Sequence, residues 1–88
     1  MRRRKAWRAV LDAEVRRRSA LSPEELLAKL GDIQVYEVEL NGKPYQVEVE
    51  ILADKPEYVQ VIVSVDDGSL PASLVPVTDT FVRAKVPR

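Results

Sequence analysis

The sequence contains no cysteine and no histidine. Without cysteine there is no disulfide, no thiol nucleophile and no zinc site of the thiolate type. Without histidine the commonest general base and metal ligand is missing, together with the Ser–His and Cys–His arrangements of nucleophilic enzymes. Any active site would have to operate with carboxylate, Lys, Tyr or Ser side chains alone. We therefore expect a protein that is not an enzyme and that binds neither a cofactor nor a metal ion.

Long apolar runs are also missing. No uninterrupted apolar stretch approaches the roughly 18 residues that a membrane span requires. A secretory signal needs an apolar stretch after its basic start, but Asp12, Glu14 and Arg16 interrupt that region. We expect a cytoplasmic protein without a membrane partner.

The charges that are present are divided unequally along the chain, although the formal net charge is zero. Residues 1–30 contain nine Lys and Arg against four Asp and Glu, a surplus of +5. Residues 31–88 contain five against ten, a surplus of −5. This polarity affects solubility, encounter rates and the choice of partner, but it is no evidence of catalysis. It indicates binding.

The chain of 88 residues, 45% of them hydrophobic and fourteen of them valine, is long enough for one domain without disulfides. It contains no internal repeat and no low-complexity tract, so residues 1–88 are predicted to form a single small α+β domain. Its composition resembles that of small Val- and Arg-rich bacterial α+β proteins, and no motif in it identifies a family.

The spacing of apolar residues predicts a first helix over residues 4–19, with residues 1–5 as a frayed basic tail. The apolar stripe of this helix comprises Trp7, Val10, Leu11 and Val15, with Glu14 inside it. Three pairs of opposite charge at i,i+4 favour the helix as well. They are Arg8 with Asp12, Asp12 with Arg16, and Glu14 with Arg18.

A short second helix is predicted by its start signal. Ser22 suits the N-cap, Pro23 suits the first helical position, and Glu25 completes a capping box. Gly31 is expected to supply a left-handed C-terminal cap. The predicted buried face of this helix consists of Leu26, Leu27 and Leu30.

The rest of the chain has the alternation of antiparallel strands. Asn41-Gly42 is a preferred two-residue type I′ turn, which pairs Val38 with Tyr45 and Tyr36 with Val47. Further strands are predicted over residues 59–65 and 81–86. Residues 69–80, interrupted by Pro71 and Pro76, are expected to form a covering loop or a short edge strand, with Leu74, Val75 and Val77 against the sheet.

The order of these elements predicts an α+β fold with two N-terminal helices packed on one face of a 3–4-stranded antiparallel β-meander. We expect its core to contain Trp7, Leu11, Leu26, Leu27, Leu30, Tyr36, Val38, Val47, Val49, Val61, Val63 and Phe81.

The first candidate site is the basic N-terminal segment. Its cations resemble a patch that contacts phosphates, and Trp7 could stack on a base. The alternative is a helix face that is solvated or turned to another protein, because several arginines already have helical carboxylate partners. The candidate contacts to a polyanion or partner are Arg2, Arg3, Arg4, Lys5 and Arg8.

The second candidate site is an acidic sheet face. The predicted register places four carboxylates on the outer side of the sheet, mixed with Ile33, Val35, Leu52 and Ile62. Their repulsion could be offset by a cationic partner such as the basic helix of a second copy. The plain alternative is the polar outside of a half-exposed sheet. The candidate acidic residues are Glu37, Glu39, Glu48 and Glu50.

Two further patterns are weak. Asp66-Asp67-Gly68-Ser69 lacks the alternating ligands of a calcium loop and is explained by a turn. Glu48 and Glu50 lie on an exposed face, which offers no pocket that would raise the pKa of a general acid. The sequence thus predicts a small interaction module that binds another protein or a second copy of itself. The alternative is a nucleic-acid or ribosome-associated accessory protein that binds phosphates through the basic N-terminal segment.

Overall fold

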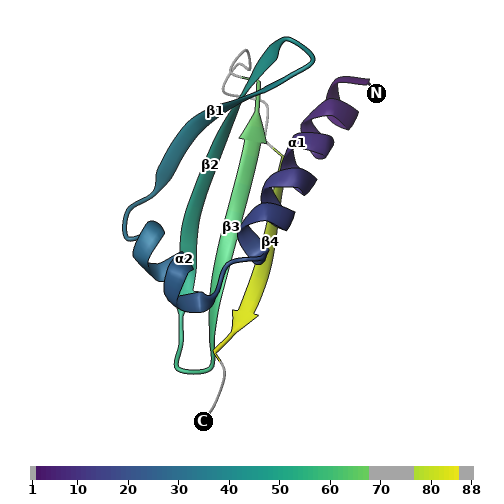
Figure 1. The fold of residues 1–88 in the computed structure, drawn as a ribbon. Coiled ribbons are helices and arrows are strands. Elements are labelled where there is room, and N and C mark those ends of the chain that lie inside the picture. Colours follow the sequence, from purple (N-terminus) through teal and green to yellow (C-terminus); the bar gives the residue numbers. More distant parts are fainter. Residues whose placement is uncertain (1, 68–76, 86–88) are drawn as a thin grey trace.

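The computed structural model describes residues 2–67 and 77–85, with side chains from Lys5 onwards. Two helices precede four strands (Figure 1). The elements are α1 (Arg2–Ser19), α2 (Pro23–Lys29), β1 (Gln34–Leu40), β2 (Lys43–Asp54), β3 (Tyr58–Asp66) and β4 (Val77–Ala84). The first helix begins two residues before its predicted start, so the backbone of residues 2–5 belongs to α1. The fraying of residues 1–5 stays a prediction.

The four strands form one antiparallel sheet in the order β1-β2-β3-β4, so each strand is hydrogen-bonded to its neighbours in sequence. α1 lies across β3 and β4, and α2 contacts β3 (Figure 1). Both helices contribute to one hydrophobic cluster with the inner face of the sheet. The predicted α+β class, with helices on one face of an antiparallel meander, is confirmed.

The first hairpin has the predicted turn and register. Asn41 and Gly42 both have positive φ, 54° and 77°, as a type I′ turn requires. Val38 pairs with Tyr45, and Tyr36 pairs with Val47. Because a slip of one residue would turn every side chain to the opposite face, this short turn determines which side of β1 and β2 is buried.

The pairing of β2 with β3 contains a bulge. Ile51 pairs with Val61 and Ala53 with Gln60, so Leu52 is the additional residue on β2. Leu52 is 48% exposed. A bulge increases the local twist of a strand, which here occurs close to the turn between β2 and β3.

The last strand begins earlier than the sequence predicts. β4 starts at Val77, four residues before the predicted start at Phe81, and pairs with β3 from Val65 onwards. Val77 is therefore a strand residue that packs against the core. The predictions made for residues 68–76, which include the turn at Gly68 and the positions of Leu74 and Val75, lie outside the described residues.

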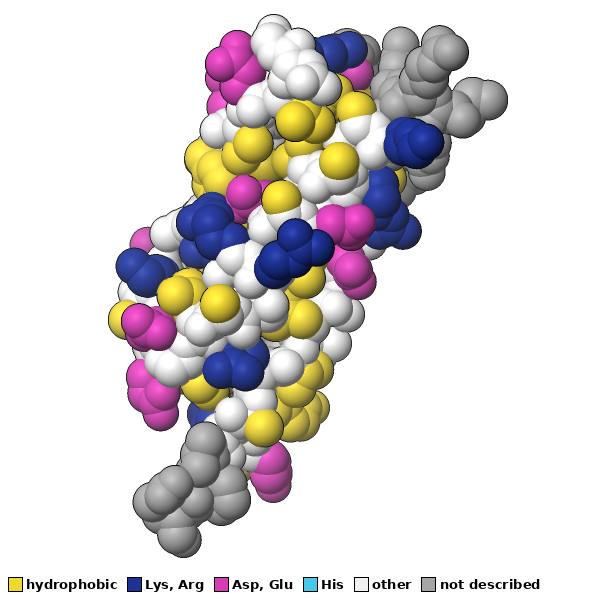
Figure 2. Space-filling view, turned by 45° about the vertical axis from the view of Figure 1, so that its right-hand side comes forward, with side chains coloured by type: hydrophobic (Ala, Val, Ile, Leu, Met, Phe, Trp, Pro, Cys, Tyr) yellow, Lys and Arg dark blue, Asp and Glu magenta, His cyan; other side chains and the backbone are white. Residues whose placement is uncertain are grey.

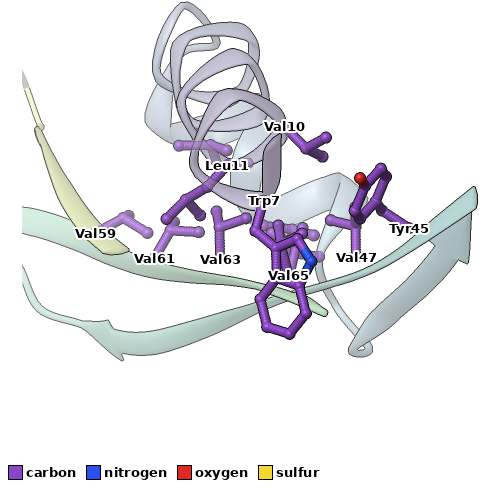
Figure 3. Packing of buried hydrophobic residues seen from close by; sticks show 12 residues of the cluster. Trp7, Val10, Leu11, Tyr45, Val47, Val59, Val61, Val63 and Val65 are labelled. Atoms are coloured by element: carbon purple, nitrogen blue, oxygen red, sulfur yellow. The ribbon is translucent and has the colours of Figure 1, made fainter. Parts of the chain in front are cut away.

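The core is a layer of valines beneath α1 (Figure 3). Alternate residues of β2 and β3 are buried, and the side chains of Trp7 and Leu11 reach down onto them from the helix. Of the twelve predicted core residues, Leu27, Tyr36, Val38 and Phe81 are half-buried at the margin of the cluster. The buried hydrophobic residues that the sequence did not place in the core are Val10, Tyr45, Val59 and Val65.

The second helix begins as predicted and ends differently. The Glu25 backbone N–H donates to the Ser22 hydroxyl at 3.1 Å, and the Ser22 backbone N–H donates to the Glu25 carboxylate at 2.9 Å. The prediction of a left-handed cap at Gly31 is wrong. Among the described glycines only Gly42 has a positive φ, so Gly31 does not adopt the left-handed conformation. The chain leaves the helix at Leu30, whose φ of −108° and ψ of 31° complete the turn.

A membrane-spanning helix would need a long apolar stretch, and no helix in the described part of the chain has one.

Candidate functional site

The sheet has a side that no described helix or loop covers, called the outer face below. Burial alternates along the strands, so the residues between the core positions of β1, β2 and β3 point to this side. The register aligns them in rows across the sheet, such as Val35, Glu48, Ser64 and Thr78. A four-stranded sheet with one packed and one uncovered face is stable in water only if the second face is sufficiently polar.

The outer face combines carboxylates with exposed apolar side chains. The four predicted acidic residues lie on β1 and β2, where Glu37, Glu39 and Glu48 are exposed and Glu50 is half-buried. Glu37 pairs with Gln46, as predicted, so no two of these carboxylates are directly opposite each other. The apolar side chains on the same face are substantially exposed, at 63% for Val35 on β1, 48% for Leu52 on β2 and 53% for Val82 on β4.

A shallow depression of about 100 Å³ lies where β1, β2 and β3 meet on this face. Val35 and Glu48 line it together with Ser64. The outer face is therefore not flat, but the depression is too small and too open for a site of general acid–base chemistry.

The exposed side of α1 contains the second group of predicted site residues. Lys5 and Arg8 are exposed, and Arg16 and Arg17 are exposed about two to three turns further along. The backbones of Arg2–Arg4 are helical, and their side chains lie outside the description. With the α1 side of the molecule turned forward, Figure 2 shows Lys and Arg side chains separated by acidic and hydrophobic ones. This view therefore shows no continuous basic patch.

Trp7 takes no part in this exposed side. It is 2% exposed and lies against the valines of the sheet (Figure 3). The hypothesis that Trp7 stacks on a nucleic-acid base is therefore wrong in this structure, because its ring has no free surface.

The predicted i,i+4 ion pairs of α1 are not formed. Among the described residues no ion pair joins Asp12 to Arg8 or to Arg16. Glu14 pairs with Arg17, at i+3, rather than with Arg18. The reason is that Glu14 is turned towards the sheet, where a second polar group competes for it.

That polar group is the hydroxyl of Tyr36 on β1. It donates to Glu14 Oε1 at 2.5 Å and accepts hydrogen bonds from Arg17 Nη2 and Arg18 Nη2, each at 3.1 Å. The hydroxyl thus uses its one donor and both of its lone pairs. Arg17 Nη2 also donates to Glu14 Oε1 at 2.6 Å. The four side chains form a compact polar cluster in which the two guanidinium carbons lie 6.0 and 5.5 Å from the tyrosine ring centroid.

Arg18 connects this cluster to α2. Its Nη2 donates to Gln34 Oε1 at 2.6 Å, and Gln34 Nε2 donates to the backbone carbonyl of Lys29 at 2.9 Å. Arg18 is only 5% exposed, and its Nε is buried without a hydrogen-bond partner among the described residues. A buried guanidinium therefore links the ends of both helices to the first strand.

The electrostatics of the cluster follow from these contacts. Burial raises the pKa of Tyr36, and the hydrogen bond to Glu14 raises it further, so its hydroxyl remains a donor. The hydrogen bond to Glu14 also raises the pKa of Arg17. The cluster contains one carboxylate for two guanidinium groups.

A hollow of about 370 Å³ lies beside the cluster, between the ends of the two helices. Its walls consist of Arg17, Arg18, Leu21, Lys29 and Gln34. None of the lining side chains is acidic. The sequence analysis did not find this site. A signal was present, because Glu14 and Arg18 follow Trp7 and Leu11 at helical spacing and so continue the buried stripe of α1 with polar residues.

Within the described residues, no three acidic side chains come together in an arrangement that could hold a metal ion. Comparisons with protein-family models, with curated proteins and with solved structures give no match to this chain. The functional argument therefore depends on the geometry of the two surfaces and of the hollow.

Proposed function

We propose that this protein is a non-enzymatic interaction module whose binding surface is the outer face of the sheet. The observation that supports it best is the composition of that face. Carboxylates on β1 and β2 share this face with exposed Val35, Leu52 and Val82, and no described part of the chain covers them. An exposed face of mixed apolar and acidic character favours a partner that offers apolar contact together with positive charge.

The occupant that we propose is the α1 helix of a second copy. Its exposed side presents Lys5, Arg8 and Arg16, none of which forms an ion pair among the described residues. A helix of 18 residues is about 27 Å long. The 12 residues of β2 extend over about 40 Å, so the helix fits along the sheet. Contact of α1 with the outer face joins two different surfaces, and such heterologous contacts produce rings or open chains of copies.

The test is light scattering coupled to size-exclusion chromatography, over a range of protein and salt concentrations. We expect assemblies larger than a monomer at low salt that dissociate as salt rises, because exposed charges are screened. Reversing two acidic residues (Glu37→Lys with Glu48→Lys) should abolish association, and so should reversing two basic ones (Arg8→Glu with Arg16→Glu).

The decisive experiment is an equimolar mixture of the two reversed variants. In each variant alone, the helix and the outer face carry charges of the same sign and repel each other. The basic helix of the first variant matches the acidic face of the second, and the acidic helix of the second matches the basic face of the first. Mixing should therefore restore assemblies in which the two variants alternate. Glu57→Lys, in the turn between β2 and β3, is the matched control and should associate like the parent chain. A monomer under all conditions, or association unaffected by both reversals, would refute this proposal.

The second candidate function is polyanion binding by the exposed cations at the start of α1. The exposure of Lys5 and Arg8 supports it. Its affinity should fall steeply with salt, because each neutralised phosphate releases counterions. Fluorescence anisotropy with labelled single- and double-stranded oligonucleotides tests it at about 50 mM salt, using the full chain and a chain that starts at Ala6. Equal binding by both chains, or no binding by either, would eliminate this candidate.

A further inference from the structure

We propose that the hollow between the ends of α1 and α2 is a binding site for a phosphate group, held by Arg17, Arg18 and Lys29. This site is independent of the outer face. The hollow has the dimensions of a small-molecule pocket, because its 370 Å³ lies in the range of about 300–1,000 Å³ that such pockets occupy.

The first argument is the charge balance. The cluster and the hollow together contain three cationic side chains, Arg17, Arg18 and Lys29, and one carboxylate, Glu14. The carbonyl ends of α1 and α2 each contribute roughly half a negative charge. The site therefore keeps a positive charge of about one unit, which an anion would neutralise.

The second argument is the burial of Arg18. A guanidinium that is 5% exposed is costly unless a carboxylate or another anion compensates its charge. The partners of Arg18 are the neutral groups of Gln34 and Tyr36, while Glu14 is bonded directly to Arg17. Arg18 also keeps a buried Nε without a partner among the described residues. The fold thus holds a buried guanidinium that has no carboxylate partner in the wall of a hollow.

The third argument concerns the shape of the anion. A planar carboxylate is satisfied by one guanidinium fork, whereas a phosphate offers several oxygens in different directions. Here two guanidinium groups come from the end of α1 and an ammonium comes from the end of α2. The Gln34 amide and Leu21 complete the walls. Donors on separate elements match a tetrahedral anion better than a planar one.

The experiment is a titration of the full chain with inorganic phosphate at constant ionic strength, with chloride as the balancing ion. We expect the thermal unfolding midpoint to rise saturably with phosphate, because a ligand that binds only the folded state stabilises it. The side-chain amide signals of Gln34 in NMR spectra should shift along the same binding curve. Glycerol 3-phosphate in a parallel titration distinguishes a phosphomonoester from free phosphate as the better ligand, and saturable binding of either one supports the site.

Two variants locate the site. Lys29→Gln removes an exposed charge at the rim without touching the buried cluster, and it should weaken phosphate binding about tenfold, the loss expected for one charge-assisted hydrogen bond. Lys55→Gln, which removes an exposed lysine charge from the turn between β2 and β3 outside the hollow, is the matched control and should bind like the parent chain. No difference between phosphate and chloride, equal weakening by both variants, or equal binding of acetate and phosphate would overturn the proposal.

Discussion

Glu14 is the residue on which the polar cluster depends. It is 7% exposed, and its Oε1 accepts hydrogen bonds from both Arg17 and Tyr36. Its carboxylate is the one negative charge of the cluster, beside the exposed guanidinium of Arg17 and the buried guanidinium of Arg18. Removing one member of such a buried set leaves the other charges uncompensated, which costs far more than the intact set contributes.

We therefore predict that Glu14→Gln lowers the free energy of unfolding by about 3 kcal/mol or more. The amide can still accept a hydrogen bond, but it carries no charge for Arg17 and Arg18. A domain of this size is expected to have roughly 4–13 kcal/mol of stability, so the loss is large enough to measure by urea denaturation.

Asp12→Asn is the matched control for this prediction. It removes a carboxylate from the same helix, but Asp12 is exposed and forms no ion pair among the described residues. Its effect should stay within about 0.5 kcal/mol. Equal effects of the two substitutions would mean that the cluster contributes nothing specific to stability.

At the scale of elements, α2 shows how a helix of seven residues is maintained. Isolated helices of this length are not stable in water, so the capping box and the packing of Leu26 must supply what the helix itself lacks. The Ser22 backbone N–H, which donates to the Glu25 carboxylate, lowers the pKa of that carboxyl below its ordinary value of 4.5.

We predict that Ser22→Ala lowers the free energy of unfolding by about 1 kcal/mol, the usual cost of a lost N-cap. Ser22→Asp, which retains a capping oxygen, should have a smaller effect. Chemical denaturation of the three chains at neutral pH measures the difference. A cost as large for aspartate as for alanine would show that the cap is not the cause.

The contribution of Glu25 also determines how this helix responds to acid. Because its pKa is lowered in the folded state, its stabilising effect is complete above about 4.5 and is lost as the pH falls through the lowered pKa. Glu25→Gln keeps a hydrogen-bond acceptor but removes the titrating group. Below that pH the free energy of unfolding of this variant should therefore fall less than that of the parent chain.

The elements differ in how far the sequence predicts them, and the difference depends on the range of the interactions. The turn at Asn41-Gly42 and the cap at Ser22 are determined by residues within four positions of each other, and both were predicted correctly. The contact of Glu14 with Tyr36 joins residues 22 positions apart. The helical spacing of Glu14 indicates that it is buried, but nothing in the sequence indicates that Tyr36 is its partner. The same holds for the hollow, whose wall requires the mutual placement of α1, α2 and β1. Gly31 illustrates the opposite error. A glycine is suited to a left-handed cap at this position, but α2 ends at Leu30 without such a cap.

At the scale of the whole molecule, the first helix depends on the last strands. The apolar stripe of α1 is buried against β3 and β4, although α1 comes first in the chain. We predict that a chain ending after Asp67, which lacks β4, loses cooperative unfolding. Trp7, the single tryptophan, reports this directly, because its fluorescence should shift to longer wavelength once it is exposed to water.

A chain ending after Lys85 is the control for this truncation, since it retains all four described strands. It should keep the emission of a buried tryptophan and a single unfolding transition. If the chain without β4 behaved in the same way, α1 would not need β4 for its packing.

The placement of α1 on the last strands also affects how the protein is made. Translation proceeds from the N-terminus at about 5–20 residues per second, so α1 is synthesised several seconds before β4. Throughout that interval Trp7, Val10 and Leu11 have no sheet to cover them. The nascent chain thus displays the apolar side of α1, which the folded protein conceals, so a chaperone that recognises exposed apolar helices can bind it only while the chain is being translated.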